Sequence, residues 1–277
     1  MSEALAQKLA TTNPAEFRRY GAEALPVVRD FYLAHHTRQT YDFARRMQSR
    51  FYGLGQREME IWDALKFLDT LIDQSDPDTQ EKTQTDHLLT TSEAMRKNGE
   101  PDWFVLVGFL HDLGKVLCLF GLPQWAVVGD TFVLGCPYPD TIVFSEFLKD
   151  NPDMLVPEFQ ARQTGIYERS CGLRNTVRTF SHDDYMARAL RVANAQAAER
   201  LPEAAFDVVE FHSLYPWHNA GSYEELMDDH DREVLPLIQR FQQYDLYTKD
   251  NRPPKLEEVR PYYEALFRRY LPPTLRF

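Results

Sequence analysis

The sequence lacks the features that tie a chain to a membrane. No apolar run reaches the roughly 18–20 residues that a membrane-spanning helix needs, and the best candidate is interrupted by His111, Asp112 and Lys115. The first residues also lack the basic start and apolar block of a signal peptide. We therefore expect a cytoplasmic protein without a membrane partner.

Basic charge and cysteine are scarce as well. The 277 residues carry 31 Lys and Arg against 42 Asp and Glu, which gives a net charge of −11. Nucleic acids are bound through basic patches, so we expect no nucleic-acid partner. The three cysteines, Cys118, Cys136 and Cys171, form no C-x-x-C pair. This argues against a disulfide framework and against a zinc finger.

Helical periodicity is present along most of the chain. It predicts one long helix over about 24–52 and a second over 58–74, with Ile61, Leu65, Leu68 and Ile72 on its apolar face. Further helices are predicted at about 83–98, 102–120, 182–198, 202–215, 231–246 and 255–270. β-Branched and aromatic residues alternate with Gly and Pro near 125–136, which predicts a short β-hairpin or an ordered loop.

The chain shows no repeat and no linker long enough to mark a domain boundary. We expect a loosely ordered segment over 1–15, followed by a single all-α domain over 16–277.

The eight histidines differ in their surroundings. His35, His36 and His230 lie among polar residues, which favours the solvated surface, and His218 on a turn is a weak candidate for a site. Three others have ordinary explanations when taken singly. His182 follows a capping serine, His87 precedes a helical turn, and His212 on an apolar face can be a hydrogen-bonded core residue.

Two aspartates have ordinary explanations too. Asp112 stands three residues before Lys115, which on a helix permits a buried ion pair, with His111 bonded to a backbone carbonyl. Asp245 ends an apolar stripe and can be a helix-end residue.

Taken together, these residues indicate a metal centre. They supply four histidines and two aspartates from five predicted helices, and nitrogen with carboxylate ligands suits iron, manganese or zinc. Six ligands exceed what one catalytic ion takes with an open position, so two ions bridged by Asp112 are the hypothesis. The sequence has no H-E-x-x-H, no P-loop, no G-x-S-x-G and no Glu-x-x-His of the ferritin-like type.

Longer strings suggest a family. "HDLGK" in an all-helical chain resembles the HD-domain superfamily, and "PQWAVVGDTF", "FHSLYPWH", "FQQYDLYTK" and "VRPYYEAL" resemble the myo-inositol oxygenase family. The resemblance runs from about residue 16 to the C-terminus. It implies an HD-type helical bundle and a di-iron enzyme that cleaves the ring of myo-inositol with O₂ to give D-glucuronate. It also implies a mixed-valent Fe(II)/Fe(III) pair, and we expect a monomer.

The resemblance also implies residue roles. His87, His111, Asp112 and Asp245 would bind one iron, while Asp112, His182 and His212 would bind the other. Asp112 and Lys115 would be catalytic. The positions implied for substrate binding are Arg18, Asp73, Gln74, Ser75, Lys115, Gly129, Asp130, His212 and Ser213. Two cations beside Lys115 would favour its neutral form unless a carboxylate or the substrate offsets them.

Two other functions fit the same ligands. A metal-dependent phosphohydrolase of the HD superfamily would share the H…HD…D core and would need cationic groups for phosphate, for which Lys115 and Arg18 are the candidates. An inactive scaffold with a structural metal would have a closed coordination shell, and Lys115 argues against it.

Overall fold

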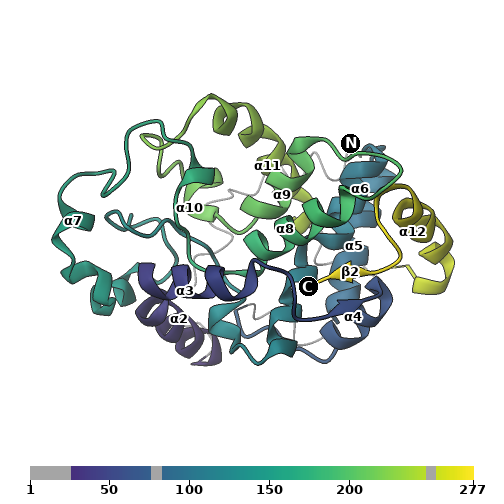
Figure 1. Ribbon diagram of the computed structural model, residues 1–277, viewed down its shortest axis with the longest axis horizontal. Helices are drawn as coiled ribbons and strands as arrows, with labels where there is room; N and C mark the ends of the chain where they lie inside the picture. The colour runs from purple at the N-terminus through teal and green to yellow at the C-terminus, as the bar shows by residue number, and fades with distance from the viewer. Residues whose placement is uncertain (1–25, 76–82, 248–253) are drawn as a thin grey trace.

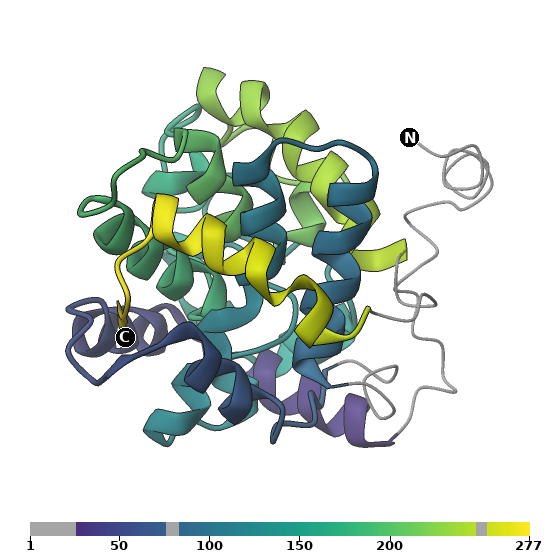
Figure 2. The same ribbon diagram turned by 90° about the vertical axis from the view of Figure 1, so that its right-hand side faces the viewer.

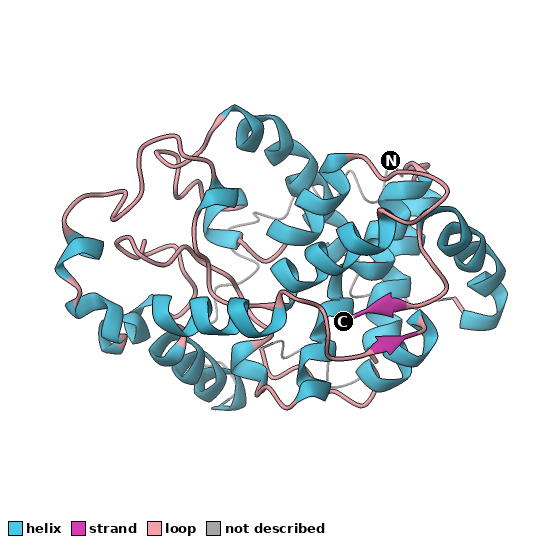
Figure 3. Ribbon diagram, in the orientation of Figure 1, coloured by secondary structure: helices cyan, strands magenta, loops and turns pink. Residues whose placement is uncertain are grey.

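Helices make up nearly all the regular structure. This computed structural model describes residues 26–75, 83–247 and 254–277. Figure 3 shows helices throughout and one small pair of strands, so the predicted all-α class is confirmed. The longer helices are α2 (Pro26–Arg38), α3 (Tyr41–Phe51), α4 (Ile61–Leu68), α5 (Gln84–Lys97), α6 (Asp102–Leu110), α8 (His182–Asn194), α9 (Glu203–Phe211), α11 (Asp229–Tyr247) and α12 (Leu256–Tyr270). The shorter ones are η3 (His111–Phe120), η4 (Gln124–Ala126), η5 (Ser145–Asp150), η6 (Pro152–Leu155), α7 (Pro157–Gln160), η7 (Leu173–Asn175) and α10 (Tyr215–His218).

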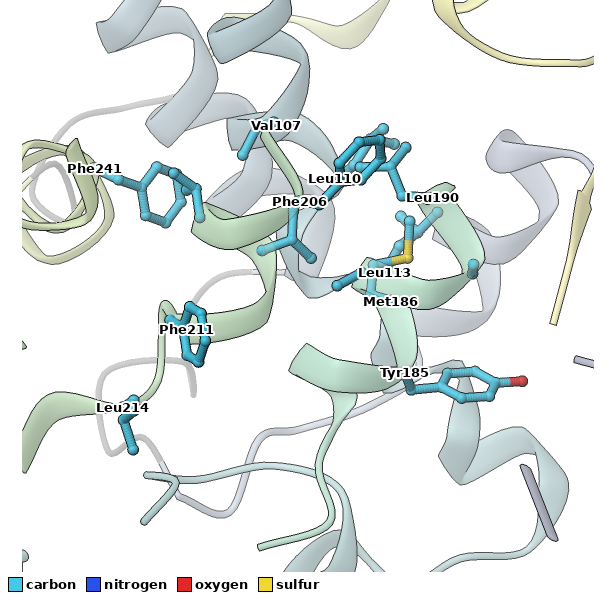
Figure 4. Packing of buried hydrophobic residues seen from close by; sticks show 14 of the residues in the cluster. Val107, Leu110, Leu113, Tyr185, Met186, Leu190, Phe206, Phe211, Leu214 and Phe241 are labelled. Atoms are coloured by element: carbon cyan, nitrogen blue, oxygen red, sulfur yellow. The ribbon is translucent and has the colours of Figure 1, made fainter. Parts of the chain in front are cut away.

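The helix α6 lies at the centre of the bundle. Every residue from Phe104 to Leu110 is buried, with α5, α9 and α12 packed around the helix (Figures 1 and 2). Figure 4 shows the next layer, where Leu113 of η3 lies against Met186 of α8. By length and hydropathy Asp102–Phe120 also passes as a membrane-crossing helix, contrary to the sequence reading. Because 78% of its apolar window is buried inside the protein, the core of the fold accounts for its composition.

The predicted helix over 24–52 is two helices, and its first two residues lie outside the described chain. Gln39 and Thr40 separate α2 from α3, and the Thr40 hydroxyl caps α3 by accepting from the Phe43 N–H. The buried Gln39 amide pairs with the backbone of Phe180 in both directions, at 2.8 and 3.1 Å. The break therefore fixes the chain just before α8 begins.

The predicted helix over 102–120 changes type within its length. It is α-helical to Leu110 and continues as the 3-10 helix η3. Residues three apart eclipse one another in a 3-10 helix, so Lys115 stands directly over Asp112. Gly114 explains why η3 and α8 come so close, because a Cβ on Gly114 would lie 2.2 Å from the His182 carbonyl oxygen. Only glycine fits there.

The second predicted helix is shorter than expected, and the two strands lie outside the segment where a hairpin was considered. The helix α4 ends at Leu68, and the predicted burial of Ile72 is wrong because that residue is 65% exposed. The strands β1 (Glu58–Met59) and β2 (Leu275–Arg276) pair antiparallel. The segment 125–136 is an ordered loop without a hairpin, joined to the 178 region by one bridge at Val133.

Candidate metal centre

All six predicted metal ligands meet at one place in the bundle. His87 comes from α5, His111 and Asp112 begin η3, His182 begins α8, His212 follows α9, and Asp245 lies near the end of α11. The Ser181 hydroxyl caps α8 by accepting from the Asp183 N–H, which places His182 on the first turn. Five of the six residues are buried, and the side chain of His87 keeps 19% of its surface.

Backbone carbonyls hold the far side of three imidazole rings. The Nδ1 of His111 is 3.0 Å from the Gly108 oxygen, that of His182 is 2.7 Å from the Val127 oxygen, and that of His212 is 2.8 Å from the Val209 oxygen. Because a carbonyl only accepts, each Nδ1 carries the hydrogen, and the Nε2 of each neutral ring presents a lone pair. Metal-binding histidines are oriented in this way.

Two of these lone pairs face each other. The Nε2 atoms of His182 and His212 lie 3.2 Å apart, and the Oδ1 of Asp112 is 3.0 and 3.6 Å from them. Three acceptors so close together repel one another unless a cation lies among them. Their type and spacing fit a divalent metal ion such as iron. We call His182 and His212 the second metal set.

A similar group lies on the other side of Asp112. The Nε2 atoms of His87 and His111 are 3.4 Å apart, and the Oδ1 of Asp245 is 3.0 and 3.3 Å from them. The Oδ2 of Asp112 is 3.6 Å from each of these nitrogens. We call His87, His111 and Asp245 the first metal set. Since Asp112 directs one oxygen toward each set, the arrangement fits two neighbouring ions with a shared carboxylate.

Lys115 is the one lysine or arginine within ion-pair range of these ligands in the described chain. Its Nζ is 2.8 Å from Asp112 Oδ2, 2.9 Å from Asp73 Oδ2 and 3.1 Å from Gln84 Oε1. Burial alone would lower the pKa of Lys115, but Asp112 and Asp73 outweigh it and raise that pKa above its ordinary value. Carboxylates thus supply the offset that a charged lysine beside two cations requires.

Both aspartate ligands are held ionised. Burial raises the pKa of a carboxyl group, but Lys115 and the neighbouring histidines outweigh it and hold the pKa of Asp112 well below its usual range. The histidines His111 and His87 do the same for the pKa of Asp245. Burial lowers the pKa of His212, but Asp183 and Asp112 raise it overall.

The predicted substrate positions gather beside Lys115. Ser75 donates from its N–H and its hydroxyl to Asp73 Oδ1, at 2.9 and 2.6 Å. Gly129 is a neighbour of Ser75, since a Cβ on that glycine would lie 3.7 Å from the Ser75 Cβ. Asp130 accepts from the Tyr32 hydroxyl at 3.0 Å.

The remaining substrate positions lie at the edges of this group. The Ser213 carbonyl accepts from Thr131, the residue after Asp130, at 2.8 Å. Gln74 is exposed and its N–H donates to Gln124 Oε1. Arg18 and the segment 1–15 lie outside the described residues.

Some histidines are placed differently from the sequence expectation. His35 and His36 are buried, so their assignment to the surface is wrong, whereas the His230 side chain is 38% exposed and contacts Asp207. His218 is buried on α10 with its Nε2 3.0 Å from the His212 carbonyl oxygen.

Sequence reasoning also missed three buried residues that contact the centre or its substrate positions. They are Tyr32, Gln84 and Asp183. Only Asp183, next to a candidate ligand in "SHDDY", carried a local signal.

Comparison with known proteins covers nearly the whole chain. A family model described as Myo-inositol oxygenase matches residues 26–277. A probable inositol oxygenase of Oryza sativa subsp. japonica is 42% identical over 267 residues, which is 94% of this chain and 85% of the relative. The inositol oxygenase of Sus scrofa is 41% identical over 270 residues, 96% of this chain and 93% of the relative. Inositol oxygenase 1 of Arabidopsis thaliana is 42% identical over 267 residues, 94% and 84% respectively.

Proposed function

The chain belongs to the myo-inositol oxygenase family and opens the ring of myo-inositol with O₂ to give D-glucuronate, and we propose that it does so at two iron ions. The first metal set and the second metal set would hold one iron each, with Asp112 shared between them. The observation that carries this proposal is the pair of opposed Nε2 groups on either side of one carboxylate. We also propose the mixed-valent Fe(II)/Fe(III) state, a monomer and a cytoplasmic location.

The two irons, when bound, would supply a Lewis acid for hydroxyls of the substrate and a redox centre at which O₂ reacts, while the substrate supplies the four electrons that reduce O₂ overall. The chain itself does the positioning. Lys115 is held between Asp73 and Asp112, beside the carboxylate that the two irons would share, so its ammonium group would lie close to a substrate hydroxyl that becomes more negative when iron binds it. A preformed donor of this kind stabilises a developing alkoxide without having to reorganise.

The other substrate positions suit an uncharged polyol. Such a ligand offers only hydroxyl groups, so the protein must bind it through hydrogen bonds. Asp73, Asp130 and Ser75 supply carboxylate and hydroxyl groups, and all three are buried. The loop around Gly129 is tied to the second metal set at two points, because Val127 accepts from His182 and Thr131 donates to Ser213, the residue after His212. The same contacts that hold the ligands would therefore hold the substrate and exclude water.

The phosphohydrolase alternative is not favoured. It needs a surplus of cationic charge for phosphate, and the charge of Lys115, its candidate among the described residues, is already balanced by two carboxylates at 2.8 and 2.9 Å. A dianionic phosphate ester beside Asp73, Asp112 and Asp130 would meet their like charge.

Oxygen uptake tests the proposed function directly. The iron-loaded protein should consume O₂ when myo-inositol is added and should form glucuronate in a one-to-one ratio with it. The matched control is the same protein stripped of iron, which should consume none. If protein shown to contain two reducible irons consumes no O₂ with myo-inositol but hydrolyses phosphate esters, the phosphohydrolase is the better assignment. Light scattering, which gives the molar mass in solution, tests the proposal that the protein is a monomer.

A further inference from the structure

One buried carboxylate beside the metal centre has no role in the function proposed above. Asp183 is the second residue of α8 and is completely buried. Its Oδ1 is buried without a hydrogen-bond partner among the described residues, and no lysine or arginine there lies within ion-pair range of it. A buried carboxylate without a cation costs several kcal/mol. A positive charge near Asp183 must therefore stabilise this carboxylate.

The neighbours of Asp183 identify the source of positive charge. Its Oδ1 is 3.3 Å from His182 Nδ1, and its Oδ2 is 3.8 Å from His212 Nδ1. These are the ring nitrogens opposite the two Nε2 atoms that face Asp112. The carboxylate thus lies behind both rings of the second metal set, where metal-bound imidazoles carry partial positive charge on their N–H groups.

Asp183 also contacts the substrate side of the centre. Its Oδ2 accepts from the Ser213 N–H at 3.1 Å, and the Ser213 carbonyl accepts from Thr131 beside Asp130. One side chain therefore touches both rings of one metal set and a predicted substrate residue.

We propose that Asp183 is a positioning residue whose negative charge acts on the rings of His182 and His212 from the side opposite the metal and whose hydrogen bond fixes the backbone of Ser213. This inference rests on the proposed two-metal function. Its negative charge raises the affinity of the second metal set for a metal ion. Its hydrogen bond to Ser213 fixes the position of this predicted substrate residue relative to His182 and His212. The first metal set has no contact with Asp183 and does not depend on it.

Asp183→Asn separates this role from a structural one. The Asn oxygen still accepts from the Ser213 N–H, which turns its NH₂ group toward His182 Nδ1, so that the negative charge beside the ring is gone and a positively polarised group stands in its place. We expect the dissociation constant of one metal ion to rise about 10- to 100-fold, as is usual when a carboxylate behind a metal-bound histidine is lost. The other ion should bind as in the wild type.

The measurement is a titration of metal-free protein with Co²⁺ under anaerobic conditions, followed by calorimetry. The matched control is Asp184→Asn, which changes the next carboxylate along α8. Asp184 pairs with Arg178 and accepts from Tyr52 on the side away from the metal centre. That variant should lower the melting temperature and leave both metal affinities unchanged.

The melting temperature of the metal-free protein provides a second readout. If Asp183 only stabilised the start of α8, Asp183→Asn would lower that temperature and leave metal affinity intact. Our proposal predicts that Asp183→Asn does not lower the melting temperature and weakens metal binding, because removing an uncompensated buried charge does not destabilise the metal-free fold. Asp183→Ala also removes the acceptor for Ser213, so it should raise the KM for myo-inositol at saturating metal more than Asp183→Asn does.

The outcomes are distinct. Wild-type protein that binds fewer than two Co²⁺ ions counts against the proposed two-metal function itself. Wild-type protein with two ions, and an Asp183→Asn variant with the same two affinities, overturns the role of Asp183. Complete loss of one ion at saturating Co²⁺ would make Asp183 a direct ligand, which also overturns a positioning role. A selective 10- to 100-fold weakening of one ion supports it.

Discussion

The protein contains two pairs of buried histidines that look alike at first sight. The ring centroids of His35 and His36 are 5.2 Å apart, and those of His182 and His212 are 5.1 Å apart. In the first pair the two Nδ1 atoms lie 3.0 Å from each other, and in the second the two Nε2 atoms lie 3.2 Å apart. The pairs differ in what each ring contacts on its other side.

The first pair is complete within the chain. The Nε2 of His36 is 2.6 Å from the Val143 carbonyl oxygen, so it carries a hydrogen and leaves Nδ1 as an acceptor. The Nδ1 of His35 therefore donates to it. Aromatic rings surround the pair, among them Tyr32 and Phe132. Burial lowers the pKa of His36 to about 4, and burial and then His36 lower that of His35.

His182 and His212 cannot share a hydrogen in the same way. Carbonyls take the Nδ1 hydrogens of both His182 and His212, so the facing nitrogens are both acceptors, and Asp112 adds negative charge. The far nitrogen of each ring thus decides whether a buried histidine pair shares a hydrogen or needs a cation. The surroundings of the two pairs differ accordingly. Uncharged aromatic rings around His35 and His36 suit neutral histidines, and carboxylates beside His182 and His212 suit a bound metal.

Removing Asp112 should have the largest effect, because His182 and His212 would lose the carboxylate that lies between them and the first metal set. In Asp112→Ala both metal sets lose their shared ligand, so we expect the iron content to fall from two per chain to at most one. Turnover should fall at least about 10³-fold, equivalent to about 4 kcal/mol. Metal analysis and O₂ uptake with myo-inositol measure the two effects.

The control for that variant is Asp207→Ala. Asp207 is equally buried and pairs with Arg174 and His230, away from the metal centre. It should lose stability but keep its iron. Two irons in Asp112→Ala would show that this carboxylate is not shared.

Replacing Lys115 tests the cation that the described part of the chain places at the centre. In Lys115→Ala the six ligands stay, so iron content should stay at two per chain. We expect kcat to fall about 10²- to 10³-fold, the usual loss when a preformed donor to a developing oxyanion is removed. Steady-state O₂ uptake with parallel metal analysis measures this. A variant with full kcat, or one that loses iron, would contradict the assigned role.

The clustering of the six candidate ligands was predictable because their signal is local. His111 and Asp112 interrupt a strongly apolar helix, and His212 and Asp245 lie on apolar faces, so each residue is a polar group aimed at the core. A polar group in such a position needs a partner, and six of them need a shared one. The resemblance to a family then sorted these six into two sets.

The features that were missed depend on residues distant in the sequence. His35 and His36 have polar neighbours such as Thr37 and Arg38, so local pattern favoured the surface; the Val143 carbonyl that satisfies His36 comes from 107 residues further on. The strands β1 and β2 join Glu58 and Arg276, which lie far apart in the sequence. Asp183 was hidden for another reason, since an acid after a capping serine is ordinary at a helix start.

The last and smallest predicted effect is the pH dependence of stability that arises from the His35–His36 pair. The unfolded chain protonates His36 below pH about 6.5, whereas the folded protein resists protonation until about pH 4. The unfolded state therefore binds more protons in this window, and the free energy of unfolding falls as the pH drops through it. From pH 7 to pH 5 the His36 contribution is a loss of about 2 kcal/mol. A glutamine at this position can donate to Val143 and accept from His35, but it does not titrate.

Comparison of wild type and His36→Gln isolates this term. Urea unfolding of the metal-free proteins at pH 7 and pH 5 gives four free energies. Histidines away from this pair cancel in the difference between the two proteins, and the pKa of His35 stays low in both because burial is its larger cause. We expect the wild type to lose about 2 kcal/mol more than the variant. Equal losses would mean that His36 is protonated in the folded state, and the pair would then hold a charge. Among the described residues the His36 ring contacts His35, aromatic rings and a carbonyl, so a charge there would have to be met by a rearrangement of the fold, whereas a metal ion would meet the same need at His182 and His212.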